Sequence, residues 1–403
     1  MNTPKIRFKG FKDDWEQRKL GEVVGIYDGV HKTPQYQDSG IMFLSVENIT
    51  TLKSEKYISE EAFERDYKVY PEKGDILMTR IGDVGTTNVV QTKEKVAFYV
   101  SLALLKPKEI NSYFLSNAMK TSVFQKGLRE RTLVTAIPQK INKDEIGRVN
   151  VFITNNAEEQ KKIGDYFTAL DHLITLHQRK CDETKQLKKF MLQKMFPKNG
   201  EKNPKIRFEG FTDDWEQRKF SELVTIERGG SPRPIDRFIT KEENGLNWIK
   251  IGDAPEQGNY ITKTEEKIKP EGLSKTREVH PGDLILSNSM SFGRPYILAI
   301  DGCIHDGWLA IRDTEKRFDL KFLCTLLGTD NMLSQYKAMA AGSTVNNLNK
   351  ELVGATTVSY PVMDEQVKLG EFFDGIDHLI TLHQRKCEKL KELKKYMLHN
   401  MFV

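Results

Sequence analysis

Two long stretches of the chain carry the hydrophobic pattern of an amphipathic helix. Residues 158–196 contain no proline and one glycine, and apolar or small side chains recur there in steps of three and four. In the first stretch they are Ile163, Phe167, Leu170, Ile174, His177, Cys181 and Thr184, and in the second Leu369, Phe373, Ile376, Ile380, His383, Cys387 and Leu390. This spacing predicts one long helix in each stretch, and Pro197 ends the first helix.

A helix with a single apolar stripe is unstable alone, and its most economical partner is the second copy. Because a globular segment joins the two stretches, we expect an antiparallel pair in which the helix midpoints meet. His177 is then expected to lie close to His383. The predicted core of the helix pair comprises Phe167, Leu170, Ile174, His177, Cys181, Phe373, Ile376, Ile380, His383 and Cys387.

A zinc site is an alternative use of the same positions. His177 with Cys181, and His383 with Cys387, are each one helical turn apart, and two such pairs can supply a tetrahedral Cys2His2 set. One pair on each of two helices is a weak signal, and a core histidine that fixes the helix register needs no metal. The pattern therefore favours a structural role, without a metal.

The chain is an imperfect tandem repeat whose ends are alike and whose middles differ. The string DHLITLHQRKC stands at residues 171–181 and 377–387, a shift of 377 − 171 = 206. PKIRF and DDWEQRK also recur, the latter at residues 13–19 and 213–219, a shift of 213 − 13 = 200. A recent duplication alone predicts even divergence. Like ends with unlike middles indicate instead that the ends contact the same structure twice, while the middles contact two different targets.

Both middles read as mixed structure. The predicted strands are 41–46, 75–80, 86–92 and 96–105 in the first middle and 246–251, 283–288, 295–300 and 307–312 in the second. A predicted helix follows in each, at residues 112–128 and 320–337, and then a polar loop. The sequence thus predicts an α+β fold with two tandem α/β domains joined by two long antiparallel helices with pseudo-twofold symmetry. The predicted boundaries are 1–157 and 198–361 for the domains and 158–197 and 362–403 for the helices.

Composition restricts the class of protein without choosing a partner. Among 403 residues, 38% are hydrophobic and 30% charged, and no run of 18 apolar residues occurs, so we expect a cytoplasmic protein without a membrane span. The four cysteines form no C-x-x-C pair, which favours reduced thiols. The 62 basic and 57 acidic residues nearly cancel, and the net charge of +5 permits a nucleic-acid partner without requiring one.

Catalytic motifs are missing from the sequence. It contains no GxxxxGK[ST], HExxH, GxSxG, GxGxxG or adenine-methyltransferase D/N-P-P-[YFW] motif. A nuclease-like pair, Glu265 and Lys267, is expected by chance at this charge content. The pattern of two unlike domains on like connectors is typical of a recognition module or adaptor, with no cofactor and no catalytic residue in this chain.

Several blocks resemble the specificity subunit of type I restriction-modification enzymes. They are DWEQRKLGEVV, PEKGDILMTRIGDVG, TLVTAIPQKINKDEIGRVNV, and EEQKKIGDYFTALD with its copy DEQVKLGEFFDGID. The resemblance covers essentially the whole chain and occurs in both halves. It implies a non-catalytic DNA-reading subunit with two target-recognition domains, each reading one half of a bipartite, asymmetric site in double-stranded DNA.

The same resemblance implies partners. The two helices are expected to set the unread gap and to dock two modification (methyltransferase) subunits, and restriction (endonuclease and translocase) subunits join the larger complex. Methyl donor and ATP are then bound by those partners, in agreement with the missing motifs.

Base-reading side chains are expected on loops of the two middles, from residue types that hydrogen-bond base edges. The candidates are Lys32, Thr79, Arg80, Asn88, Arg131 and Lys140 in the first domain and Arg228, Arg233, Asn288, Arg294, Asn346 and Asn347 in the second. For each, a solvated surface residue or a phosphate contact is the competing interpretation. A scaffold whose middles bind protein is the alternative function. Duplex binding measured against salt distinguishes the two, because a slope near zero contradicts DNA reading.

Overall fold

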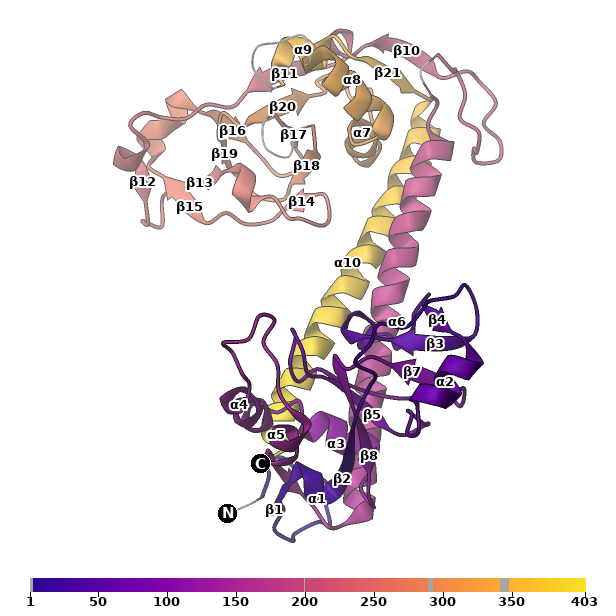
Figure 1. The fold of residues 1–403 in the computed structure, drawn as a ribbon. Coiled ribbons are helices and arrows are strands. Elements are labelled where there is room, and N and C mark those ends of the chain that lie inside the picture. Colours follow the sequence, from indigo (N-terminus) through magenta and orange to yellow (C-terminus); the bar gives the residue numbers. More distant parts are fainter. Residues whose placement is uncertain (1–2, 199, 289–292, 341–347) are drawn as a thin grey trace. The chain divides into compact units, whose positions relative to one another are not determined.

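The computed structural model describes residues 3–198, 200–288, 293–340 and 348–403, and its chain divides into two compact units (Figure 1). The first unit comprises Met1–Leu176 with Lys386–Val403, and the second comprises His177–Arg385. Each unit therefore contains one mixed domain and one part of each long helix. The predicted α+β class is confirmed.

The first domain is built from short strands and helices that precede the first long helix. Its elements are β1 (Glu16–Lys19), α1 (Leu20–Val23), β2 (Val24–Asp28), β3 (Ile41–Leu44), η1 (Val46–Asn48), β4 (Tyr57–Ile58), α2 (Glu60–Asp66), β5 (Ile76–Thr79), β6 (Thr87–Val89), β7 (Val96–Phe98), β8 (Leu102–Pro107), α3 (Ser112–Ala118), α4 (Ser122–Glu130), α5 (Lys143–Gly147) and β9 (Asn150–Ile153). Among the described residues the sheet orders are β2-β8-β5-β6, β4-β3-β7 and β1-β9.

The second domain has corresponding elements in the same chain order, and its two main sheets are larger than those of the first domain. Its elements are β10 (Glu216–Lys219), η2 (Phe220–Glu222), β11 (Thr225–Arg228), η3 (Ile235–Arg237), β12 (Ile239–Thr240), β13 (Leu246–Ile249), η4 (Ile251–Asp253), β14 (Tyr260–Ile261), β15 (Glu266–Ile268), η5 (Pro270–Lys275), β16 (Arg277–Val279), β17 (Leu284–Ser287), β18 (Pro295–Leu298), β19 (Gly302–Ile304), β20 (Trp308–Arg312), α7 (Leu320–Leu327), α8 (Asp330–Ala340), α9 (Lys350–Gly354) and β21 (Thr357–Tyr360). Among the described residues the sheet orders are β11-β20-β17-β18-β14, β12-β15-β13-β19-β16 and β10-β21.

The long helices are α6 (Ala157–Met195) and α10 (Met363–Asn400), and α6 begins and ends within one residue of the predicted 158–196. Asn156 caps α6, since its side-chain oxygen accepts from the backbone N–H groups of Glu158 (3.0 Å) and Glu159 (3.1 Å). Within each unit the two helices run antiparallel, because contacts step forward along α6 as they step back along α10 (Figure 1).

Two helices that the sequence predicted as continuous are each divided into two in the structure. The helix predicted at 112–128 is two helices, α3 and α4, because Thr121 caps the second one: its hydroxyl accepts from the N–H of Phe124 and donates to the carbonyl of Ala118. The helix predicted at 320–337 breaks in the same way at Thr329, between α7 and α8. A threonine that bonds its own backbone competes with helix continuation.

The strand predicted at 96–105 is also two strands. β7 pairs in parallel with β3, whereas β8 pairs antiparallel with β2 and β5 in another sheet. A turn separates them, in which the N–H of Leu102 donates to the carbonyl of Tyr99 at 2.9 Å. Continuous hydrophobicity hid this turn, since both strands are buried on both faces.

The core of each unit is continuous from the domain into the helices. We call the repeated stretches at residues 4–19 and 204–219 the entrance segments. In the first unit, Trp15 of the entrance segment packs on Phe114 of α3 and on Phe402 after α10, with ring centroids 5.4 and 5.8 Å apart. In the second unit, Trp215 packs on Phe322 of α7 and on Phe196 after α6, at 6.0 and 5.8 Å. The repeated ends therefore build the same aromatic cluster twice.

Candidate nucleic-acid interface

Thr79 and Arg80 lie at the end of β5 and in the turn after it, and this turn contacts the exposed loop of residues 133–140. Arg80 is 7% exposed; its guanidinium forms an ion pair with Asp28 at the end of β2 and donates to the carbonyl of Ile141 at 3.1 Å. The carbonyl of Arg80 in turn accepts from the N–H of Ile141 at 3.0 Å. Arg80 is therefore committed to internal bonds that fix where the polar loop returns to the domain.

Residues 133–140 form a hairpin-like loop, which we call the finger. Its base is closed by the N–H of Leu133 donating to the carbonyl of Lys140 (2.8 Å) and by the reciprocal bond (3.4 Å). Gln139 ties the finger to the β5 turn: its carbonyl accepts from the N–H of Gly82 at 2.8 Å, and its side-chain amide donates to the carbonyl of Gly82 at 2.9 Å. Lys140 is exposed beside this junction.

The other candidates of the first domain have separate surroundings. Thr79 is buried, and its hydroxyl oxygen accepts from the N–H of Thr86 at 2.9 Å. Asn88 donates to the carbonyls of Ile49 (2.9 Å) and Thr50. Arg131 is half-buried and donates to the carbonyl of Gly127, whereas Lys32 is exposed. The structure thus brings Thr79, Arg80 and Lys140 together and leaves the rest apart.

The second domain gathers three candidates around Asp306. Arg228 at the end of β11 donates to the Asp306 carbonyl at 3.3 Å, and the Asn288 side-chain amide donates to the same carbonyl at 2.9 Å. Arg233, 84% exposed along its side chain, lies 3.9 Å from the Asp306 carboxylate. Asn288 is buried, so the exposed cationic groups of this cluster are the two arginines.

Arg294 lies elsewhere in the second domain. Its guanidinium donates to the carbonyls of Glu256 (2.8 Å) and Gly258 (3.3 Å) and stacks 5.0 Å from the centre of the Tyr296 ring. Asn346 and Asn347 lie outside the described residues.

The two clusters occupy matching places on a shared backbone scaffold. The N–H of Arg80 donates to Ser101 at 2.9 Å, and that of Asn288 donates to Gly307 at 3.0 Å. The carbonyls of both residues accept from the segment that leads to the next short helix, at Ile141 and Leu348, at 3.0 Å in each case. Asp28 with Arg80 in one domain thus corresponds to Arg228 with Asn288 in the other. One backbone scaffold thus presents different side chains in the two domains.

Sequence reasoning missed several residues of these clusters. Asp28, Gln139 and Asp306 hold the candidate arginines and the finger in place, and no local motif marks them because their partners are distant in sequence. Val134 and Ile137, at the finger, are 69% and 100% exposed. The signal for them is visible in the chain: an uncharged, apolar run, LVTAIP, between basic residues.

The helix pair repeats its polar contacts in both units. Arg7 forms a two-bond ion pair with the buried Glu159 of α6, at 2.6 and 2.9 Å, and Arg207 does the same with Glu365 of α10, at 2.8 Å for both bonds. Lys394 pairs with Asp171 at 2.5 Å in the first unit, and Lys188 pairs with Asp377 at 2.6 Å in the second. Each entrance segment is thereby fixed to the first turn of a long helix.

The predicted core positions of the helices lie mostly inside. Ile174 and His177 are half-buried; the remaining positions outside the histidine pair are buried, namely Phe167, Leu170, Cys181, Phe373, Ile376, Ile380 and Cys387. The Nδ1 atoms of His177 and His383 lie 3.0 Å apart, so one ring donates and the other accepts. Among the described residues no group of three or more His, Cys, Asp or Glu side chains is arranged to hold a metal.

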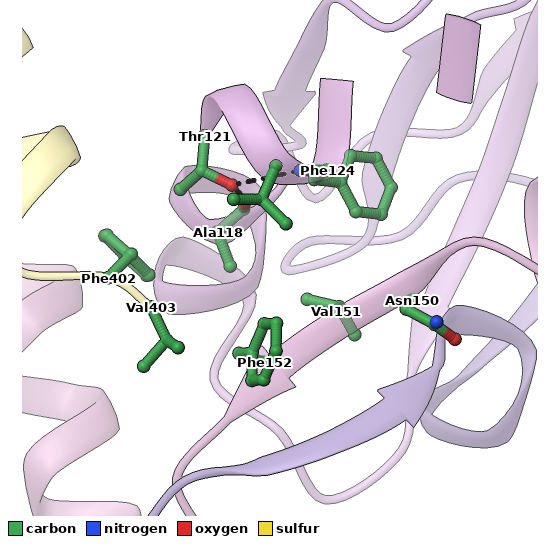
Figure 2. A pocket seen from close by; sticks show the side chains of 9 residues that line it. Ala118, Thr121, Phe124, Asn150, Val151, Phe152, Phe402 and Val403 are labelled. Carbon is green, nitrogen blue, oxygen red and sulfur yellow. Dashed lines mark hydrogen bonds between the residues drawn. The ribbon is translucent and has the colours of Figure 1, made fainter. Parts of the chain in front are cut away.

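The last residues of the chain contact the first domain. Figure 2 shows Phe402 and Val403 beside Thr121 at the start of α4 and Phe152 of β9, around a small cavity. On another side of the same residues lies a cleft of 910 Å³ whose basic lining residues are Lys5, Lys120, Lys391, Lys394, Lys395 and His399. Burial, with a smaller contribution from the neighbouring Lys394, lowers the pKa of Lys120 to about 8, whereas Asp171 opposes the shift.

Exposed apolar side chains also recur at equivalent helix positions. In the first unit they are Leu173, Leu393 and Tyr396, and in the second Leu379, Leu187 and Phe190, each between 40% and 58% exposed. Equivalent exposed apolar residues on two units are typical of two like protein-binding surfaces. Burial raises the pKa of the Cys303 thiol to about 11 and that of the Cys324 thiol to about 12, which makes both thiols poor nucleophiles. No helix in the described ranges is both long and apolar enough to cross a membrane.

Comparison with known proteins gives one consistent answer. The family model for the type I restriction modification DNA specificity domain matches twice, at residues 12–186 and 212–392. The type I restriction enzyme MjaVIII specificity subunit of Methanocaldococcus jannaschii is 21% identical over 96% of this chain and 92% of its own length. A second protein of that organism, provisionally named the MjaX specificity subunit of a type I restriction enzyme, is 22% identical over 99% and 95%.

Solved structures share the fold. The S subunit of a type I restriction-modification system from M. genitalium superposes with a TM-score of 0.69 at 14% identity, covering 100% of this chain and 99% of that one. A chain from a study of complex assembly and conformational transition in the type I system gives 0.52 at 16% identity, covering 95% and 96%.

Proposed function

Because this chain belongs to the family of type I restriction-modification DNA specificity subunits, with two tandem specificity domains, we propose that it reads a bipartite site in double-stranded DNA on behalf of catalytic partners. Each domain reads one half-site. The observation that carries this proposal is the pair of matching clusters, with Asp28 and Arg80 on one scaffold and Arg228, Asn288 and Asp306 on the other. The proposal includes the division into domains 1–157 and 198–361 and helices 158–197 and 362–403.

The proposed DNA contacts are Lys140 of the first cluster and Arg228 and Arg233 of the second, together with Lys32, Arg131 and Arg294, which lie outside the clusters. Thr79, Arg80, Asn88 and Asn288 support them, since their polar atoms already bond within the domain. Asn346 and Asn347 remain proposed contacts on sequence grounds alone. Methyl donor and ATP belong to the partners, and the protein works in the cytoplasm, with the host DNA.

We further propose that two modification subunits dock on the helix pair, one per unit, and that restriction subunits join that complex. The repeated exposed apolar positions support this, because Tyr396 corresponds to Phe190 and Leu393 to Leu187. Tyr396→Glu and Phe190→Glu should each reduce the number of modification subunits bound per chain from two to one, by burying a charge in an apolar contact. Mass measurement of purified complexes checks this, and retention of two subunits by both variants contradicts it.

The DNA-reading proposal is tested by the salt dependence of duplex binding. The chain, purified with its modification partners, should bind duplex DNA with an affinity that falls steeply as salt increases, because phosphate contacts release counterions. Arg233→Ala should lower the slope by about one charge equivalent. A slope near zero for the wild-type complex contradicts the proposal and favours a protein-binding scaffold.

A further inference from the structure

The finger of the first domain carries apolar side chains that the described part of the chain leaves largely exposed. Ile137 is 100% exposed, Val134 is 69% exposed and Leu133 is 46% exposed. Single exposed apolar residues are common on protein surfaces, but three branched side chains within five positions of one loop form a patch. Such a patch indicates a contact with another molecule.

The finger is held in a fixed position. Its base carries two backbone hydrogen bonds between Leu133 and Lys140, and Gln139 adds two bonds to Gly82. Directly after it, Ile141 exchanges bonds with Arg80, whose guanidinium is paired with Asp28. Because the base is fixed to the turn after β5 and, through Arg80, to the end of β2, the tip is presented without a large ordering cost on binding.

The charge around the finger points to a polyanion. Basic residues flank the apolar run of the finger, namely Arg131 and Lys140 with Arg129 and Lys143 beyond them, whereas the acidic residues Glu130, Asp144 and Glu145 lie outside the finger. Arg129, Lys140 and Lys143 are exposed. Cations flanking an apolar tip match the surface of duplex DNA, where phosphates border the groove and base edges line it.

The chemistry of base edges then narrows the target. In the major groove, the thymine 5-methyl is the apolar group that distinguishes one base from the others, and aliphatic side chains read it by contact. An alternative is a wedge between base pairs, but unstacking a step costs free energy that burial of one isoleucine does not clearly recover. Contact with a methyl group requires no such deformation.

We propose that Ile137, supported by Val134, contacts a thymine 5-methyl group in the half-site read by the first domain, and so contributes sequence specificity through an apolar contact. This inference rests on the proposed DNA-reading function. Arg80 and Gln139 act as positioning residues for it, through Ile141 and Gly82.

The test removes methyl groups from both sides of the contact. The complex of the chain with its modification partners is titrated with duplexes in which each thymine of the first half-site is replaced, one at a time, by deoxyuridine, which lacks the 5-methyl. One replacement should weaken wild-type binding about fourfold, the value of one buried methyl. The Ile137→Ala complex should bind the thymine duplex several-fold more weakly and show no further loss with that deoxyuridine.

The control variant is Val362→Ala, since Val362 is a 54% exposed apolar residue in the other unit. It should respond to deoxyuridine as the wild type does. Ile137 is fully exposed, so its truncation leaves the domain folded, and unchanged salt dependence of binding confirms that phosphate contacts are intact.

Other outcomes overturn the inference. Equal deoxyuridine effects in wild type and Ile137→Ala, or a first half-site without thymine, show that the tip does not read a methyl group. Fluorescence of 2-aminopurine that rises on wild-type binding and not with Ile137→Ala assigns a wedge instead. Loss of modification-subunit binding by Ile137→Ala assigns the tip to a protein partner. Failure of the DNA-reading proposal itself appears separately, as wild-type binding without salt dependence.

Discussion

Arg80 is a side chain of a DNA-reading type that the fold uses for support. Its guanidinium is paired with Asp28 and bonded to Ile141, and the side chain of Arg80 is 8% exposed. Residue type and position in a glycine-bearing turn do not reveal this, because the partner Asp28 lies 52 positions earlier in the sequence. Burial of polar groups depends on tertiary contacts, which is why the sequence could name Arg80 as a candidate but could not predict its internal bonds.

Arg80→Ala should therefore destabilise the first domain. Removing the guanidinium leaves the half-buried Asp28 carboxylate without its partner and frees the return of the finger, at a cost of about 2–4 kcal/mol. Urea unfolding of the chain measures this, and reading of one half-site should be relaxed while the other stays intact. Lys140→Ala, at an exposed position, is the control, with a change under about 0.5 kcal/mol. Equal stability of Arg80→Ala and wild type contradicts the positioning role.

Lys120 carries an electrostatic cost at neutral pH. Its pKa is lowered from 10.5 to about 8 by burial and by Lys394. Between these two values the unfolded chain binds more protons than the folded one, so stability rises with pH through that window, and below pH 8 the full penalty applies. The equivalent position in the second unit is Gly328, where no such charge is present.

Lys120→Met should stabilise the first unit at pH 7 by about 1–2 kcal/mol, after allowance for solvent in the open cleft. The gain should shrink as pH rises above 8 and vanish above 10.5, where the wild-type amine is neutral in both states. Thermal unfolding of both proteins across this pH range provides the measurement. A gain that is independent of pH contradicts the assignment of the penalty to the ammonium charge.

At the scale of elements, the repeated ends of the chain are explained largely by contacts with one another. Phe402, after α10, packs on Trp15 and Phe167, and Phe196, after α6, packs on Trp215 and Phe373. The end of each long helix thus completes the core beside the start of the other. Both helices and their repeat could be predicted from periodicity, because a long amphipathic stripe is a strong local signal.

Shorter elements were predicted less well, for reasons that particular residues make clear. The helices break at Thr121 and Thr329 because the threonine hydroxyl bonds to a nearby backbone carbonyl. The strand breaks between β7 and β8 because the chain passes from one sheet to another. Neither is visible in hydrophobic spacing alone.

Phe402→Ala and Phe196→Ala should each destabilise one unit by about 3–5 kcal/mol, the usual cost of truncating a buried phenylalanine. Tryptophan fluorescence during denaturation reports this, since Trp15 and Trp215 lie against these rings. Phe190→Ala, at a 49% exposed position, is the matched control and should change stability by less than about 1 kcal/mol. If Phe190→Ala loses as much unfolding free energy as Phe402→Ala and Phe196→Ala, the aromatic clusters are not the main source of stability.

At the scale of the whole molecule, the two halves share one structural framework and differ in the side chains at equivalent positions of the candidate clusters. The entrance ion pairs, the interhelix ion pairs and the aromatic clusters recur, whereas Asp28 with Arg80 gives way to Arg228 with Asn288. A framework that is the same in both halves, with different side chains at the candidate DNA contacts, fits the proposal that the subunit reads two unlike half-sites and binds two like partners.

Sequencing of methylated DNA from cells that express this chain with its modification partners tests the central claim most directly. The account predicts one bipartite motif, with two unlike specified parts separated by a gap of fixed length, and it predicts that Arg233→Ala relaxes only one part. A continuous motif, a motif unchanged by substitutions in either domain, or methylation that is independent of this chain contradicts it.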